Sequence, residues 1–143
     1  MLLAAFLATV IGISDGDSLT VLNENNQQVK IRLAEIDAPE KHQPFGAKSK
    51  QSLSDLCFGK VAEVIPRALD RYKRTVGRVK CAGVDANEEQ VNRGMAWVYR
   101  KYAKDHDLYV LEHGAKLAKR GLWADSFPTP PWEWRKNRNV RKI

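Results

Sequence analysis

Residues 32–40, which read Arg-Leu-Ala-Glu-Ile-Asp-Ala-Pro-Glu, decide the fold of this chain. Val29, Ile31 and Leu33 alternate with charged residues up to this stretch, which predicts a half-buried β-strand. Pro39 restricts the residue before it to extended geometry and offers no N–H to a partner strand, so the strand must end here. An arginine, an aspartate and a glutamate therefore lie near one strand end, and loops at such ends commonly carry binding and catalytic residues.

We expect this strand over residues 28–36, and the positions of Arg32 and Asp37 limit how far it can continue as a regular strand. The two residues differ in parity, so a regular strand would point their side chains to opposite faces of the sheet. If both serve one site, the strand has to bulge or end between Glu35 and Asp37.

The composition is that of a globular protein with one main domain. The chain has 143 residues, of which 43% are hydrophobic and 29% charged, and this length is sufficient to bury a core. Its formal net charge of +7 favours a polyanionic partner such as nucleic acid, although such an excess also serves solubility alone. No apolar run approaches the roughly 18 residues that a membrane-spanning helix needs, so no membrane association is expected.

Hydrophobic periodicity and turn residues predict an α+β fold. Short polar turns at residues 14–17 and 23–26 join the first three strands into an antiparallel meander. The expected elements are strands over residues 7–13, 19–22, 28–36, 61–65 and 75–81, and helices over residues 45–58, 85–93 and 108–120. We interpret this order as a five-stranded OB-fold β-barrel with about three α-helices.

We expect residues 1–125 to form the domain and residues 126–143 to form a basic tail. The tail is rich in proline and tryptophan, so it is not expected to be helical throughout. Trp132 and Trp134 are expected to pack onto the barrel rather than to read bases.

Carboxylates on two loops indicate a metal site. Asp17, Asp37 and the backbone carbonyl of Ala38 offer oxygen ligands only, which suits Ca²⁺, and water and a phosphate would complete the shell. Glu40 then lies where a general base could activate water. The alternatives are that Asp17 only caps a hairpin and that Glu40 is a solvated surface residue.

Basic and aromatic residues complete the candidate site. Arg32 and Arg74 suit a phosphate, because a guanidinium forms two parallel hydrogen bonds with phosphate oxygens. Four further residues are expected to bind substrate by contacting its phosphates or stacking on its bases: Arg71, Tyr72, Tyr99 and Tyr102. For the arginines the alternative is ordinary salt bridging, and for the tyrosines it is ordinary packing.

Three motifs in order give a family resemblance. They are Asp-Gly-Asp-Ser at residues 15–18, the stretch at 32–40, and Asp-Arg-Tyr-Lys-Arg at residues 70–74. Together they resemble the staphylococcal nuclease (thermonuclease) family, over roughly residues 8–125. The resemblance implies an OB-fold barrel and a calcium-dependent phosphodiesterase that acts on single- and double-stranded DNA and RNA, with no obligate protein partner.

The resemblance also implies roles for individual residues. Asp17, Asp37 and the Ala38 carbonyl match the metal ligands, and Glu40 matches the residue that activates water. Arg32 and Arg74 match the two phosphate-binding arginines, and Arg78 is the weaker rival for the second, because it falls inside the predicted strand. Tyr72 matches a phosphate-contacting tyrosine, and the second active-site tyrosine is either Tyr99 or Tyr102. Ser18 and Lys73 depart from the usual threonine and glycine.

A noncatalytic nucleic-acid-binding module is the competing interpretation. Domains of this kind that have lost their chemistry keep the barrel as a docking surface. The full set of carboxylates and arginines in this chain favours the enzyme.

The two cysteines bear on where the protein works. Cys57 ends a predicted helix and Cys81 ends a predicted strand 24 residues later, so we predict a disulfide between them, with two separate buried thiols as the alternative. A disulfide and the apolar N-terminus, in which a trimmed export signal would reach to about Ala5, predict a secreted or periplasmic protein.

Overall fold

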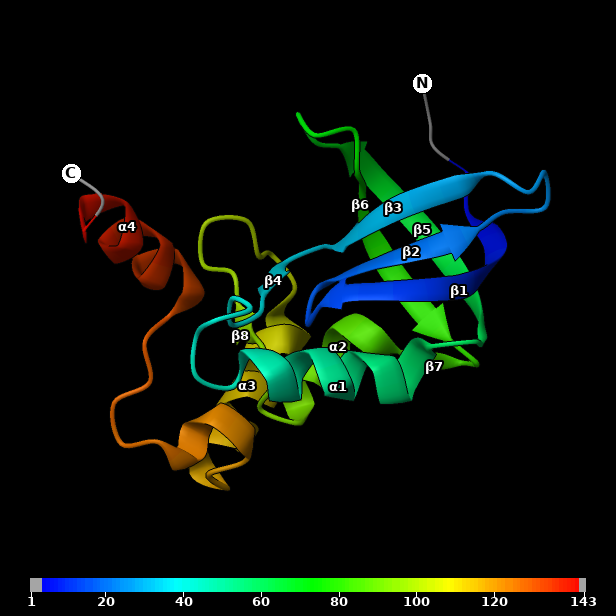
Figure 1. Ribbon diagram of the computed structural model, residues 1–143. Helices are drawn as coiled ribbons and strands as arrows, with labels where there is room; N and C mark the ends of the chain where they lie inside the picture. The colour runs from blue at the N-terminus through cyan, green and yellow to red at the C-terminus, as the bar shows by residue number, and fades with distance from the viewer. Residues whose placement is uncertain (1–3, 142–143) are drawn as a thin grey trace.

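A computed structural model describes residues 4–141 and shows a closed β-barrel with helices packed against it (Figure 1). The expected remnant of an export signal falls mainly on residues 1–3, outside the described part. The predicted fold class is confirmed, and the described residues form four α-helices instead of about three. None of the described helices is both long enough and apolar enough to cross a membrane.

The barrel is a six-stranded sheet in the order β3-β2-β1-β5-β6-β7, closed by parallel pairing of β3 with β6. Closure brings Ile31 beside Thr75 and Leu33 beside Gly77. Neighbouring strands on the other edges are antiparallel, as the short turns predict. The strands are β1 (Phe6–Asp15), β2 (Ser18–Leu22), β3 (Gln28–Leu33), β5 (Val61–Leu69), β6 (Thr75–Cys81) and β7 (Val84–Asp85).

The third strand ends earlier than residue 36. β3 stops at Leu33, and a turn follows in which Glu35 has a left-handed backbone with φ of 67°. The chain then forms β4 (Ile36–Asp37), which pairs with β8 (Trp97–Val98) in a separate two-stranded sheet. The Arg32 guanidinium donates to the carbonyls of Leu33 and Ile36 on either side of this turn, at 2.6 and 2.9 Å. The predicted interruption is therefore present, and it lies at residues 34–35.

Three helices and a short 3₁₀ turn cover one end of the barrel. α1 (Gly46–Cys57), α2 (Ala86–Asn92) and α3 (His106–Leu117) lie together beneath the strands, followed by the turn η1 (Gly121–Ala124) (Figure 1). Their apolar faces join the inward side chains of the strands in one core cluster. A second small cluster forms around Trp97 and Trp123.

The tail contains the fourth helix. α4 (Pro131–Arg141) lies to one side of the molecule and is joined to the rest by residues 125–130 (Figure 1). Pro131 is compatible with this helix because a proline at the first helical position loses no intrahelical hydrogen bond. Trp132 packs against the second core cluster, whereas the sequence predicts that it packs onto the barrel.

Two buried amide side chains on α2 fix the loops at the end of the barrel. Gln90 donates to the carbonyls of Gly16 and Ser49, at 2.8 and 3.0 Å, and so ties the β1–β2 turn to α1. Asn87 donates to the carbonyl of Ala34 at 2.9 Å and accepts from the amide of Val79 at 3.1 Å. These contacts hold the turn before Asp17 and the turn before Asp37 on one rigid support.

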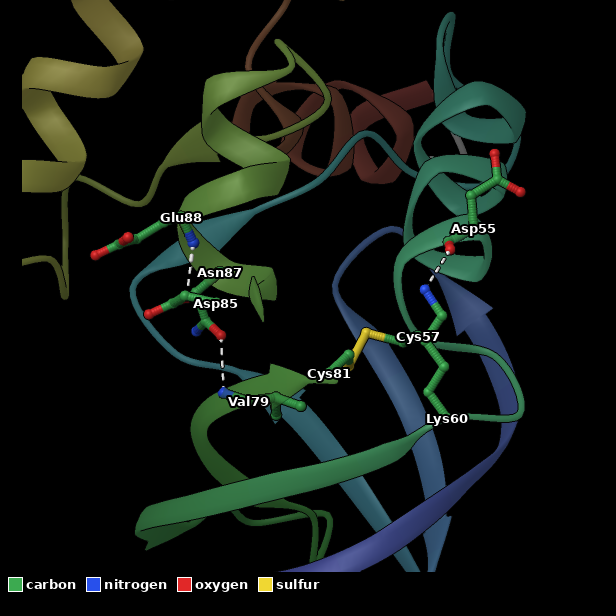
Figure 2. Close-up of a disulfide and its surroundings, with 8 residues drawn as sticks. All are labelled: Asp55, Cys57, Lys60, Val79, Cys81, Asp85, Asn87 and Glu88. Carbon is green, nitrogen blue, oxygen red and sulfur yellow. Dashed lines mark hydrogen bonds between the residues drawn. A yellow bond between two sulfur atoms is a disulfide. The ribbon is translucent and has the colours of Figure 1, made fainter. Parts of the chain in front are cut away.

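The predicted disulfide between Cys57 and Cys81 is present. It joins the last residue of α1 to the last residue of β6, with the two Cα atoms 5.1 Å apart (Figure 2). Both cysteines are buried in the main core cluster. The bond therefore fastens the helical layer to the barrel.

We expect the double substitution Cys57→Ala/Cys81→Ala to lower the free energy of unfolding by about 3 kcal/mol, because opening a 24-residue loop restores entropy to the unfolded chain. Urea denaturation with and without a reductant measures the change. Reductant should destabilise the wild-type protein and leave the double variant unaffected. Equal stability of the oxidised and reduced wild-type proteins would contradict a stabilising bond.

Candidate active site

One cavity of about 860 Å³ opens where the barrel loops, the segment after β8 and α4 meet. It collects residues from distant parts of the sequence, from Asp15 to Arg135. Its wall includes every residue that the sequence analysis assigns to metal binding, substrate binding or catalysis: Asp17, Arg32, Asp37, Ala38, Glu40, Arg71, Tyr72, Arg74, Tyr99 and Tyr102.

Arg32 holds two buried carboxylates together at the base of this cavity. Its Nη2 lies 3.3 Å from Asp17 Oδ2 and 3.2 Å from Asp37 Oδ1. Asp17 Oδ2 also accepts a hydrogen bond of 2.7 Å from the amide of Ala38. The β1–β2 turn and the β3–β4 connection are thus joined through the side chains that they carry.

The carboxylates at this point perturb one another. Burial, followed by the nearby charge of Asp17, raises the pKa of Asp15 to about 7. Burial also raises the pKa of Asp37, against the opposing effect of Arg135 and Arg32. For Asp17, burial is outweighed by Arg32 and by hydrogen bonds from neighbouring groups, so its pKa is lowered. Negative charge is therefore concentrated in a poorly solvated place that favours a cation.

The donor set fits a hard cation held partly by protein. Among residues 4–141, no group of three or more His, Cys, Asp or Glu side chains is arranged to bind a metal ion by itself. Asp17, Asp37 and the Ala38 carbonyl provide oxygen atoms only, the ligand type that calcium and magnesium prefer. Such a set leaves part of the shell to water and to a bound anion.

Glu40 lies beside this pair and forms an ion pair with a residue of the tail. Its Oε1 accepts a hydrogen bond of 2.6 Å from Nη1 of Arg135. Nη2 of Arg135 donates to Asp37 Oδ2 at 2.7 Å. Burial opposes the charge of Arg135, but hydrogen bonds to Asp37 and Glu40 raise the pKa of its guanidinium.

Aromatic rings form the outer wall. Tyr72 is 64% exposed, with the guanidinium of Arg71 5.0 Å from its ring centre. Tyr99 and Tyr102 are packed edge to face, with ring centres 5.0 Å apart. Both tyrosines line the cavity, so either is placed to meet a substrate.

Comparison with known proteins decides the family. The family model described as staphylococcal nuclease homologue matches residues 30–125. The chain is 44% identical to an uncharacterized endonuclease of Haemophilus influenzae, over 92% of this chain and 74% of that protein. It is 40% identical to a micrococcal nuclease of Shigella flexneri, over 93% of this chain and 82% of that protein. The chain belongs to the staphylococcal nuclease homologue family.

A more distant relative of the family comes from a plant. The chain is 37% identical to a probable staphylococcal-like nuclease, CAN1, of Oryza sativa, over 88% of this chain and 40% of that protein. Relatives from bacteria and plants thus share most of this domain.

The two rival arginines have different surroundings in this member of the family. Arg74 lines the cavity, where its Nε donates to Asp70 at 2.8 Å. Arg78 is 8% exposed, is not among the residues that line the cavity, and lies among four carboxylates. Its partners are Glu35, Asp85, Glu88 and Asp105, at 2.9–3.3 Å. The geometry therefore favours Arg74 for substrate contact and gives Arg78 a structural ion-pair network.

Sequence reasoning missed three residues of the site. Asp15 is placed in a turn and in the Asp-Gly-Asp-Ser motif but is given no role in the site, although its spacing from Asp17 indicates that the two carboxylates can influence each other's pKa. Arg135 and Trp132 belong to the tail, outside the family motifs, and only the basic and aromatic composition of the tail hinted at them. Trp132 stacks on Tyr99 with an interplanar angle of 3°, and Arg135 lines the cavity, so the tail forms part of its wall.

We expect Arg74→Lys to lower the rate of phosphodiester cleavage by roughly a hundredfold, because lysine keeps the charge but loses the planar fork. Its stability should change by less than about 0.5 kcal/mol, since the Arg74–Asp70 pair is partly exposed. Arg78→Lys should instead destabilise the fold by about 2 kcal/mol, because lysine keeps the charge but loses several hydrogen bonds to the partly buried carboxylates. Urea denaturation and cleavage assays on folded protein measure both effects. A silent Arg74→Lys beside a folded but inactive Arg78→Lys would reverse the assignment.

Proposed function

We propose that this nuclease is a calcium-dependent phosphodiesterase that hydrolyses single- and double-stranded DNA and RNA. One observation carries the proposal: a single cavity holds two buried carboxylates bridged by Arg32, with Glu40 and Arg74 in its wall. Members of the family are generally metal-dependent, and the donor set here is made of oxygen atoms. The net charge of +7 suits a polyanionic substrate.

Asp17, Asp37 and the carbonyl of Ala38 would hold the calcium ion. When bound, such a hard cation offsets phosphate charge and orients water for attack. Calcium suits this set better than magnesium, because it tolerates an irregular shell that includes water and substrate oxygens.

The residues of the chain supply the proton transfer and the remaining charge stabilisation. Glu40 accepts the proton of the attacking water, a role that needs a carboxylate within hydrogen-bond reach of that water. Arg32 and Arg74 donate to phosphate oxygens, on which negative charge grows in the transition state. The bonds that Arg32 makes to the carbonyls of Leu33 and Ile36 hold its guanidinium beside the site.

The outer wall binds the rest of the nucleic acid. The rings of Tyr72, Tyr99 and Tyr102 offer faces or edges for bases, and stacking of this kind tolerates any sequence. Arg71 and Lys101, also in the wall, would contact backbone phosphates. These features support action on both DNA and RNA.

Addition of calcium should start cleavage of fluorescent single- and double-stranded DNA and RNA, and excess chelator should stop it, because the phosphate charge is then left uncompensated. Gel or fluorescence assays follow the products. Undiminished cleavage in excess chelator would contradict the metal dependence.

The substitution Glu40→Gln separates the enzyme from a noncatalytic binding module. It should lower turnover by a hundredfold or more, the scale for losing a proton-transfer group, while the exposed control Glu24→Gln stays active. Nucleic acid that binds but stays uncut by the wild-type protein, with calcium present, would favour the binding module.

We also propose that the protein works outside the cytoplasm, in the periplasm or as a secreted protein. The disulfide supports this, because such bonds persist in oxidising compartments and are rare in the cytosol. Fractionation of the native host, followed by detection with an antibody, should find the protein outside the cytoplasm with both cysteines protected from alkylation. Protein confined to the cytosol with two free thiols would contradict the proposal.

A further inference from the structure

Helix α4 places a cation of the protein itself in the candidate metal site. Nη1 of Arg135 lies 2.6 Å from Glu40 Oε1 and 3.2 Å from Asp37 Oδ1, and Nη2 lies 2.7 Å from Asp37 Oδ2. Both oxygens of Asp37 thus accept from Arg135, and Oδ1 also accepts from Arg32. The guanidinium of Arg135 therefore binds both Asp37, which the proposed function assigns to the metal, and Glu40, which it assigns to the attacking water.

Specific contacts hold the helix in this position. The ring of Trp132 stacks on Tyr99 with centres 5.7 Å apart, and it meets Trp97 edge to face at 5.6 Å. In the segment before the helix, the carbonyl of Thr129 accepts a hydrogen bond of 2.6 Å from Gln43. These contacts, made by residues that precede Arg135 in the sequence, direct its side chain into the cavity.

The attachment is nevertheless local. Among the α4 residues whose side chains the structure describes (131–138), Trp132 packs against the small cluster around Trp97, and none belongs to the main core cluster of the barrel. The preceding segment is poorly covered, since Phe127 is 90% exposed. Elements held by few buried side chains open at a lower free energy than the rest of a domain.

We propose that α4 is an autoinhibitory latch, in which Arg135 competes with the calcium ion for Asp37 and holds Glu40 in an ion pair. This inference rests on the proposed calcium-dependent function. A cation that binds Asp37 has to displace Arg135, and its departure also frees the Glu40 carboxylate to accept a proton. A site that is closed in nine of ten molecules binds its ligand about tenfold more weakly than an open one.

Calcium titration of the full chain by isothermal calorimetry, without nucleic acid, tests the latch. Arg135→Gln should bind calcium roughly tenfold more tightly than the wild-type protein. Arg138→Gln is the matched control, because it removes the same charge from an exposed position on the same helix and should leave the affinity unchanged. Equal or weaker binding by Arg135→Gln, or an equal gain in both variants, would overturn the latch.

Hydrogen exchange followed by mass spectrometry gives a second readout of the helix itself. Calcium should speed exchange of the amides in residues 131–138 of the wild-type protein, because Arg135 is released. The same peptide should exchange fast in Arg135→Gln with or without calcium. A helix that stays equally protected after calcium has bound would overturn the proposal.

The outcomes separate the latch from the proposed function. Calcium-dependent cleavage with equal calcium affinities in all three proteins would contradict the latch and support the proposed nuclease function. A gain of calcium affinity in Arg135→Gln without cleavage of any nucleic acid would support the latch and contradict the proposed nuclease function. Absence of calcium binding in all three proteins would overturn both. Loss of cleavage in Arg135→Gln at unchanged calcium affinity would mean that Arg135 serves the substrate instead.

Discussion

The carboxylates of Asp17 and Asp37 carry like charges and lie close together, and the guanidinium of Arg32 bridges them and offsets their repulsion. Without a shared cation, two buried carboxylates would repel each other and one would take up a proton. The same guanidinium donates to the carbonyls of Leu33 and Ile36, so it also shapes the turn that brings Asp37 back toward it. One side chain therefore sets both the charge balance of the site and the path of the chain around it.

The remainder of the fold acts as a rigid support for that arrangement. Asn87 and Gln90 are fully buried on α2, and their amides hold the two loops that carry the carboxylates. Polar groups at such depth are costly unless they are paired, and a fully paired network specifies a unique geometry. The disulfide adds a covalent link between the helical layer and the barrel. The β1–β2 turn and the turn between β3 and β4 are thus fixed in position by the helix α2.

How far the sequence predicts this molecule depends on how local each signal is. Strand alternation and turn residues predict the barrel, and β6 begins and ends at the expected residues, Thr75 and Cys81. The parity of Arg32 and Asp37 correctly requires a break in the strand, but the left-handed backbone at Glu35 depends on tertiary contacts, so the break lies one residue earlier than expected. Arg135 has no local signal at all. Its role follows from the packing of Trp132 on Tyr99, which brings together residues far apart in the chain.

Parallel closure of the barrel also governs the order in which the site can assemble during synthesis. Asp17 and Arg32 leave the ribosome early, but β3 has no second neighbour until Thr75–Cys81 has been made. Asn87 and Gln90, which hold the two loops, emerge later still. Contacts of such long sequence separation form slowly, because the intervening chain loses entropy before any pairing is gained. A nascent chain that ends before α2 therefore contains the motif residues without the assembled site. Arg135 emerges only after Asn87 and Gln90, which hold the loops of the site, have been made.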